Sequence, residues 1–248
     1  MAGASLRPVR PTRSDYAAPP VYVYPDRPKP GLRFSRVELV QLGIAVAALA
    51  LAMTFLFVRG AAFDFFAGRL SGAGFATLFG LYLAMSLLAV GTGVGLHEIA
   101  HKAVAQRYGH WAEFRYNPMG LMLAFVFAFI GFIYGAPGAT YISGYVTNEQ
   151  NGRISAAGPL TNIVLGSGFM GLSAVLEVAG TSTGILVARV ILDAAALINL
   201  ILAGFNMLPL MPLDGAKVWA WNKGAYVGIV GIVAALVVVG WRAGLLGF

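Results

Sequence analysis

Hydrophobic residues gather in long runs along this chain, and polar residues are largely confined to the segments between the runs. About 20 consecutive apolar residues allow an α-helix to cross the hydrocarbon core of a bilayer. The runs that approach this length lie at 38–58, 74–96, 156–177, 184–205 and 225–241. We expect the second helix to continue to Arg107, and the Phe-rich segment at 60–72 to lie at the membrane interface. The pattern predicts an all-α polytopic membrane protein with about five to six transmembrane helices.

A sixth apolar stretch, residues 121–134, is short for a span and is followed by a break rich in Gly and Pro at 135–139. If this stretch crossed the membrane, Lys217 and Lys223 would lie on the side opposite to the basic amino-terminal segment. The positive-inside rule favours a re-entrant segment or a membrane-associated hairpin instead. Residues 140–146 carry β-prone side chains and are expected to supply strand structure there.

Composition supports a membrane protein and restricts its chemistry. The 248 residues are 58% hydrophobic and 11% charged, with a mean hydropathy of +0.77. A soluble domain carries about 25% charged residues. The chain contains no cysteine, which excludes disulfides, thiolate ligands and a cysteine nucleophile. Any metal site must therefore use nitrogen and oxygen ligands.

The positive charge of the chain is concentrated in residues 1–36, which are also rich in Pro and Tyr and show no apolar periodicity. This segment lacks the apolar stretch of a signal peptide. We interpret it as a disordered basic cytoplasmic tail that precedes a single membrane domain at 37–248. Anionic lipid headgroups are the partner that such a tail favours, and we expect no nucleic-acid binding.

Residues 97–101 read H-E-x-x-H and follow the second apolar run directly. On a helix His97 and His101 share one face, so both imidazoles can bind one ion. Glu98 lies beside the first histidine and can act as a general base without binding the metal. This arrangement is typical of zinc hydrolases. Ionisable groups at membrane depth are costly, which favours a functional site over a packed core histidine.

A catalytic zinc ion needs a third protein ligand. The extended motif of metzincins is absent, because Val104 and Arg107 occupy the positions of its glycine and third histidine. The remaining candidates are His110, Glu113, Glu149, Glu177, Asp193 and Asp214. Asp214 is the strongest of these, because Pro209 and Pro212 interrupt the helix before it and glycine follows it. Broken helices at membrane depth commonly build binding sites.

Three motifs together give the chain its family resemblance. They are H-E-x-x-H at 97–101, G-P-x-x-N at 158–162, and N-x-x-P followed by L-D-G within 206–215. In this order, on separate apolar segments, they resemble the site-2 protease family of intramembrane zinc metalloproteases. The resemblance covers about residues 74–215. Between the second and third motifs there is no insertion long enough for a PDZ domain. We expect no carboxy-terminal regulatory domain either, which would make the chain similar to the minimal prokaryotic form of the family.

The resemblance implies a role for each motif. One Zn²⁺ per chain would be held by His97, His101 and Asp214, with Glu98 as the general base and Asn162 as the donor to the oxyanion. It also implies β structure near the active site within 110–155. The implied substrate is a transmembrane segment of another membrane protein. The implied site faces the cytoplasmic side of a prokaryotic cell membrane.

Other functions remain open at this point. A membrane zinc hydrolase could act on lipid or on soluble peptides. A metal transporter would require polar residues along a pathway through several spans, whereas here they cluster at one depth. A non-catalytic zinc scaffold is disfavoured by Glu98 and by the absence of a fourth ligand in the motifs. If the chain is a protease, a strand from 121–146 is expected to pair with the unwound substrate.

Overall fold

The computed structural model describes residues 31–132 and 135–246. Most of the segment interpreted as a disordered tail, residues 1–36, therefore lies outside the described residues. The described part of the chain begins just before the first helix.

Five helices among the described residues are long and apolar enough to cross a membrane, which confirms the all-α polytopic fold. They are α1 (Arg36–Phe66), the continuous helix Gly72–Arg107, α5 (Asn148–Ala179), α6 (Thr183–Asn206) and α8 (Lys223–Arg242). The second of these consists of α2 (Gly72–Val90), a π-helical turn η1 (Gly91–Leu96) and α3 (His97–Arg107). The segment at 60–72, predicted to lie at the membrane interface, consists of the end of α1, a turn and the first residue of α2.

Hydroxyl side chains mark where three of these helices begin. Ser35 and Ser71 accept hydrogen bonds from backbone amides three residues ahead, at the starts of α1 and α2. Thr147 forms a reciprocal capping box with Gln150 at the start of α5. Such caps satisfy amides that have no partner inside the helix, a need that is greatest near a membrane.

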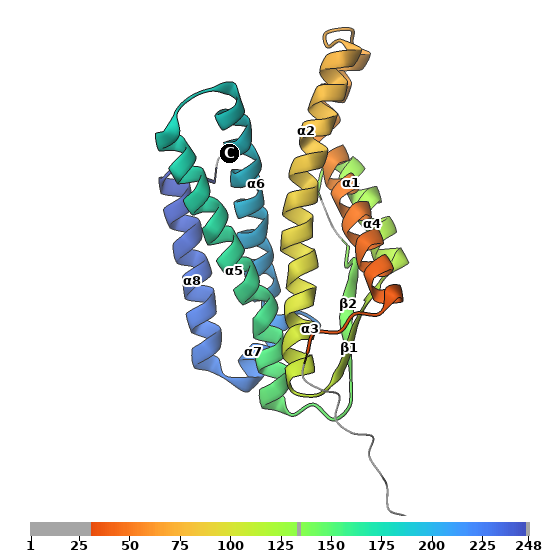
Figure 1. Cartoon of the computed structure of the whole chain (residues 1–248), viewed down its shortest axis with the longest axis vertical. Helices are drawn as coiled ribbons and strands as arrows, with labels where there is room; N and C mark the ends of the chain where they lie inside the picture. Colours follow the sequence, from red (N-terminus) through yellow and green to blue (C-terminus); the bar gives the residue numbers. More distant parts are fainter. Residues whose placement is uncertain (1–30, 133–134, 247–248) are drawn as a thin grey trace, which may run out of the picture.

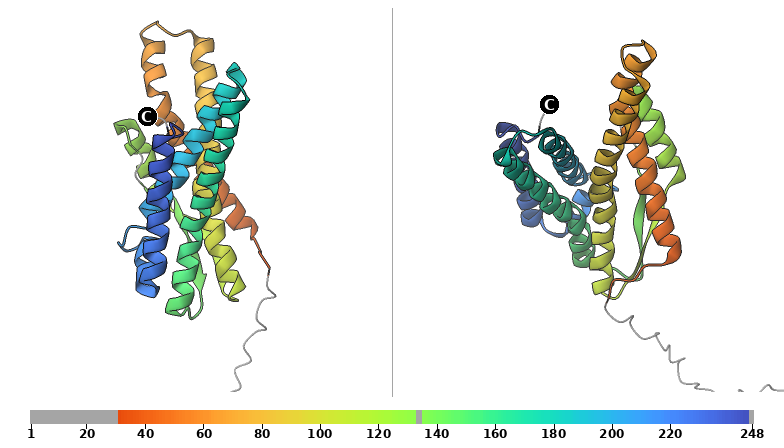
Figure 2. Two further views of the ribbon diagram at one scale, coloured as in Figure 1. Left: turned by 90° about the vertical axis from the view of Figure 1, so that its left-hand side faces the viewer. Right: turned by 45° about the horizontal axis from the view of Figure 1, so that its top comes forward.

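The helix α2–α3 runs through the centre of the molecule between two groups of elements (Figure 1). On one side lie α1, α4 and a small sheet, and on the other lie α5, α6 and α8. Figure 2 shows the same separation from two further directions. Each group has its own apolar core, and α3 contacts both α5 and the sheet.

The connection between α3 and α5 leaves and returns on the same side, as the positive-inside argument predicted (Figure 1). It consists of β1 (Trp111–Tyr116), the 13-residue helix α4 (Pro118–Ile130) and β2 (Gly138–Ser143). The strands pair antiparallel, with Phe114 opposite Thr140. Because α4 is too short to span a bilayer, it forms the re-entrant part of the connection. The strand expected within 140–146 begins and ends earlier than predicted.

The chain between α6 and α8 is not helical until α7 (Asp214–Trp221) begins. Gly215 allows the start of α7 to lie against the end of α6. A Cβ atom at this position would stand 2.3 Å from the carbonyl oxygen of Met207, closer than any side chain can approach. The glycine after Asp214 therefore sets the position of the aspartate relative to the membrane helices.

Candidate metal and catalytic site

Three side chains predicted as zinc ligands meet between α3, α5 and α7. The Oδ2 atom of Asp214 lies 3.3 Å from Nε2 of His97 and 3.1 Å from Nε2 of His101. All three side chains are buried, and one nitrogen or oxygen atom from each lies within 4.8 Å of the others. Two imidazole nitrogens and one carboxylate oxygen form a donor set that suits zinc with an open fourth position.

The two histidines owe their common direction to α3. Their spacing places both rings on one face of the helix, with ring centroids 4.6 Å apart and planes inclined at 85°. The π-helical turn η1 ends directly before His97. Such turns insert one extra residue into a helix and shift the faces that follow, and they are frequent at functional sites.

Two asparagines support the π-helical turn from neighbouring helices. Asn162 of α5 donates from Nδ2 to the carbonyl oxygen of Gly93 at 3.1 Å. Asn199 of α6 donates to Oγ1 of Thr92 at 3.0 Å. Both amides are completely buried. The turn that aims His97 is thus fixed to both α5 and α6, and Asn199 faces the interior of the bundle as a structural group.

His101 is oriented by the backbone of α5. Its Nδ1 atom lies 2.7 Å from the carbonyl oxygen of Ile154. An imidazole that donates its Nδ1 proton to a carbonyl presents the lone pair of Nε2, which is the atom that faces Asp214. This contact fixes both the tautomer and the ring plane needed for a metal ligand.

Gly158 forms the floor of the ligand cluster. A Cβ atom at this position would lie 2.5 Å from Nε2 of His101 and 2.6 Å from Nε2 of His97. Only glycine lets α5 approach both rings this closely while keeping their nitrogen atoms open to a ligand. The donor set, its burial and this close approach fit a metal ion of the size and preference of zinc.

Asp214 is the first residue of α7, and its side chain reaches the cluster from there. Burial disfavours its charged form, but the His101 and His97 rings, when their Nε2 atoms carry protons, supply positive charge and hydrogen bonds that outweigh that effect and hold the pKa of this carboxyl well below its usual range. Its second oxygen, Oδ1, lies 3.5 Å from Nζ of Lys217, one turn further along α7. The aspartate is therefore ionised and presents one oxygen to the histidines.

Glu98 points toward the sheet, where it contacts a residue that the motifs did not identify. Its Oε2 atom accepts hydrogen bonds from the backbone amide of Thr140 at 2.9 Å and from the Thr140 hydroxyl at 2.8 Å. The β-prone character of 140–146 and the family resemblance both indicated strand structure in this region. Which of its residues meets Glu98 depends on register, and register is set by contacts distant in sequence.

Asn162 lies beside the ligand cluster, on the turn of α5 that follows Gly158. One of its two amide hydrogens is used by the carbonyl oxygen of Gly93. The predicted role as an oxyanion donor would require the other. The side chain has no exposed surface, so its position is set by packing.

The other carboxylates and the third histidine lie apart from the cluster. Their partners are Gln150 for His110, Arg115 for Glu113, Arg153 for Glu149 and Arg189 for Glu177. Asp193 lies in α6 with the side chains of Ser173 and Arg189 nearby. Within the described part of the chain, the cluster of His97, His101 and Asp214 is the single group that could hold a metal ion.

Comparison with known proteins supports the zinc chemistry. The chain is 40% identical over 192 residues to "Putative zinc metalloprotease MJ0611" of Methanocaldococcus jannaschii, covering 77% of this chain and 87% of that protein. It is 25% identical over 138 residues to "Zinc metalloprotease MJ0392" of the same organism, covering 56% of this chain and 34% of that protein.

No family model and no solved structure matches the chain. The identity to the first relative extends over most of both proteins, and both relatives are named zinc metalloproteases. The resemblance drawn from the three motifs is confirmed at this level. The chain is a multi-pass membrane protein that belongs to the zinc metalloprotease family of these archaeal proteins, the family that its motifs indicated.

Proposed function

We propose that this protein is an intramembrane protease of the site-2 type, which hydrolyses peptide bonds within or near transmembrane segments of other membrane proteins. The observation that carries the proposal is the buried cluster of His97 and His101, on a helix long enough to span the membrane, with Asp214 of the short helix α7. Glu98 and a strand lie beside this cluster. A hydrolytic site inside a membrane domain would act on substrates that lie in the membrane, such as transmembrane helices. The proposed catalytic unit is residues 37–248, with its core at about 74–215.

The ligand cluster would hold one zinc ion per chain, and a bound zinc ion supplies Lewis acidity at the scissile carbonyl. Glu98 takes a proton from the attacking water and returns it to the leaving nitrogen, so the carboxylate is regenerated. The second amide hydrogen of Asn162 donates to the oxyanion as it forms. Burial of the cluster keeps bulk water from the reacting atoms.

A transmembrane helix must unwind before it is cut, because its carbonyl groups are engaged in the helix. Strand β2 offers an edge for the unwound segment. The amide of Thr140 points away from β1 toward Glu98, and backbone amides alternate along a strand, so the amide of Ile142 points the same way. Pairing at Ile142 would place the substrate alongside the base.

The proposed orientation places the site toward the cytoplasmic side of a prokaryotic cell membrane. The helices α3 and α7 and the start of α8 lie toward the end of the molecule from which the described chain begins (Figure 1). These elements carry Lys102, Arg107, Lys217 and Lys223. An excess of Lys and Arg at one end indicates the cytoplasmic side. The proposed tail at 1–36 would lie there against lipid headgroups, and no nucleic acid is involved.

The test is cleavage of a reporter transmembrane segment by purified protein in detergent, comparing wild type with Glu98→Gln at matched zinc content. We expect wild type to cut and Glu98→Gln to bind zinc without cutting. Equal cleavage by both proteins would refute the assigned base. If neither cuts the reporter while a soluble peptide or a lipid is hydrolysed by wild type alone, the substrate class is wrong.

A further inference from the structure

The carboxylate of Glu98 is held through only one of its oxygens. Both donors of Thr140, the backbone amide and the hydroxyl, lie within 3 Å of Oε2. The same hydroxyl lies 3.2 Å from the backbone oxygen of Glu98. No residue in the described ranges is hydrogen bonded to Oε1, which leaves that oxygen available for proton transfer. The contacts of Oε2 thus hold the carboxylate in place, and Oε1 is the oxygen that can accept a proton.

The strand that carries Thr140 is fixed by its partner strand. Phe114 of β1 stands directly opposite Thr140. The amide of Phe114 points to the outer side of the sheet and donates to Oε1 of Glu38 at 3.0 Å. At this level of the sheet each outward amide is therefore bound by a glutamate, one from α1 and the other being Glu98 of α3.

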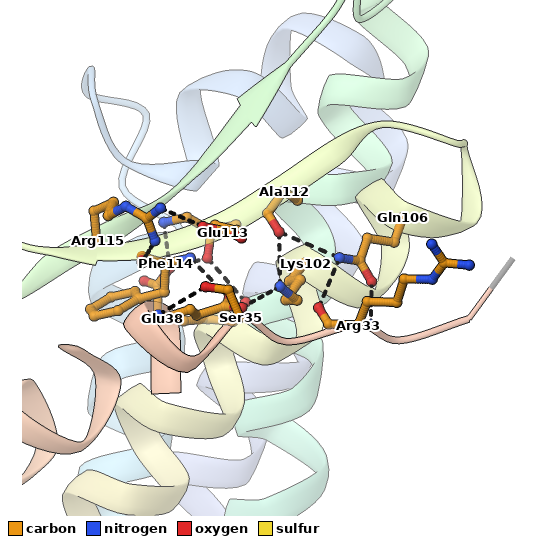
Figure 3. Close-up of polar contacts among 11 residues, drawn as sticks. Arg33, Ser35, Glu38, Lys102, Gln106, Ala112, Glu113, Phe114 and Arg115 are labelled. Carbon is orange, nitrogen blue, oxygen red and sulfur yellow. Dashed lines mark hydrogen bonds and ion pairs between the residues drawn. The ribbon is translucent and has the colours of Figure 1, made fainter. Parts of the chain in front are cut away.

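A buried ion pair completes the attachment (Figure 3). Oε2 of Glu38 accepts a hydrogen bond from Nζ of Lys102, and each side chain is only 1% exposed. The same Nζ donates to the carbonyl oxygen of Ala112 in β1 at 2.8 Å. Lys102 lies one helical turn after Glu98, so α3 contacts β1 through the lysine and β2 through the glutamate.

A gain in folding stability does not by itself explain why Glu38 and Lys102 form a buried ion pair. Replacing a buried ion pair with apolar side chains is often neutral or stabilising, because desolvation of the charges offsets their attraction. The pair instead fixes the position of strand β1, because it binds the backbone at Ala112 and Phe114 against α1 and α3. The opposite strand then presents Thr140 to Glu98 in one register.

We propose that Thr140 is a positioning residue for the general base, fixing the Glu98 carboxylate from a strand that the Glu38–Lys102 pair holds in place. This inference rests on the proposed function, in which Glu98 moves the proton. The sheet would then position the Glu98 carboxylate, in addition to any pairing with substrate. The base is carried by α3, but its direction is set by β2.

The direct test is a pair of substitutions at Thr140. Thr140→Val keeps the shape and the backbone amide but removes the hydroxyl, whereas Thr140→Ser keeps the hydroxyl. We expect Thr140→Val to lower kcat by about 10- to 100-fold, as for a misplaced catalytic group, with KM and zinc content unchanged. Thr140→Ser should recover most of the lost kcat. Ser143→Ala, which removes an exposed hydroxyl from the same strand, should leave kcat unchanged.

A second readout does not depend on cleavage. In metal-free protein, thermal unfolding of Thr140→Val, Glu98→Ala and the double variant forms a double-mutant cycle. We expect the two substitutions to be non-additive, because either one removes the same contact. Additive shifts in Tm would overturn the proposed coupling between the hydroxyl and the carboxylate.

The outcomes separate the two proposals. If Glu98→Gln is inactive but Thr140→Val turns over like wild type, the positioning role is wrong and the proposed function stands. If Thr140→Val and Thr140→Ser lose kcat equally, the hydroxyl has no positioning role. If Glu98→Gln retains full cleavage, the assigned base fails, and the role of Thr140 fails with it.

Discussion

The helix α3 presents two neighbouring faces that hold their groups in different ways. On one face His97 and His101 lie against α5 and α7, where Gly158 brings the backbone almost into contact with both rings. On the other, Glu98 and Lys102 reach the sheet through hydrogen bonds. Within each pair the two residues lie one helical turn apart, and Glu98 and Lys102 each directly follow one of the histidines in the sequence. The ligand face, with the two histidines, depends on close packing. The sheet face, with Glu98 and Lys102, depends on directed polar contacts.

This difference predicts two kinds of failure. Changes on the ligand face should empty the metal site and abolish cleavage together. Changes on the sheet face should lower turnover while zinc stays bound. The substitutions below test that division in order of decreasing effect on cleavage.

The largest effect is expected for Gly158→Ala. The added methyl would lie about 2.5 Å from both histidine rings, so α5 or the rings must shift. We expect zinc content and cleavage both to fall close to background, with a loss of stability of about 1–3 kcal/mol from overpacking. Metal analysis, thermal unfolding and the reporter assay measure the three quantities.

Gly171→Ala is the matched control, because a methyl at this position of the same helix meets no other atom within 4 Å. It should retain zinc, stability and cleavage. Full zinc occupancy in Gly158→Ala would contradict the view that close approach of α5 builds the ligand face.

Asn162→Ala should lower kcat by about 10²–10³-fold if the side chain donates to the oxyanion, as in other hydrolases. Asn199→Ala provides the comparison, since Asn199 also supports the π-helical turn but does so from α6, through Thr92. Zinc content should be unchanged in both variants. An equal loss of kcat in the two variants would indicate that Asn162 acts only by supporting the turn.

On the sheet face, Glu38→Gln leaves the ammonium group of Lys102 buried without its carboxylate. We expect a loss of about 3–5 kcal/mol in the free energy of unfolding, together with a lower kcat. Glu149→Gln breaks an exposed pair with Arg153 and should cost at most about 1 kcal/mol.

The double variant Glu38→Leu, Lys102→Met separates stability from positioning. Apolar side chains should restore much of the stability lost in Glu38→Gln. Turnover should stay low, because neither side chain can bind the backbone of β1. Recovery of turnover along with stability would show that the sheet needs no polar anchor.

The smallest effect is expected at the edge of β2. Ile142→Pro removes an outward amide without removing a hydrogen bond to β1, and we expect cleavage to fall about tenfold, the value of one hydrogen bond of about 1.4 kcal/mol. Ile142→Ala removes the side chain but keeps the amide. Unchanged cleavage in Ile142→Pro, with zinc bound, would exclude substrate pairing at this position.

The sequence predicted the ligand face far better than the sheet face. The spacing of His97 and His101 is local to one helix, and two prolines before Asp214 marked a helix break, so both features could be recognised from residue type. The apolar runs predicted all five spans because the bilayer imposes their length.

The contacts of the sheet could not be predicted in the same way. The contact between Thr140 and Glu98 depends on strand register, and the ion pair of Glu38 and Lys102 joins positions far apart in the chain. A glutamate near the start of a membrane helix gives no indication of its partner. The π-helical turn before His97 was likewise unforeseen, since the glycines there are equally typical of close helix packing.

The close approach of Gly158 also limits how a substrate can gain access. If α5 swung away from α3, the carbonyl of Ile154 would withdraw from His101, and the ring would lose the contact that orients it. Such an opening would dismantle the site that it was meant to expose. Under the proposed function, a substrate segment therefore has to reach the site without separating α3 from α5, and a crosslink between these two helices should leave cleavage of the reporter unchanged.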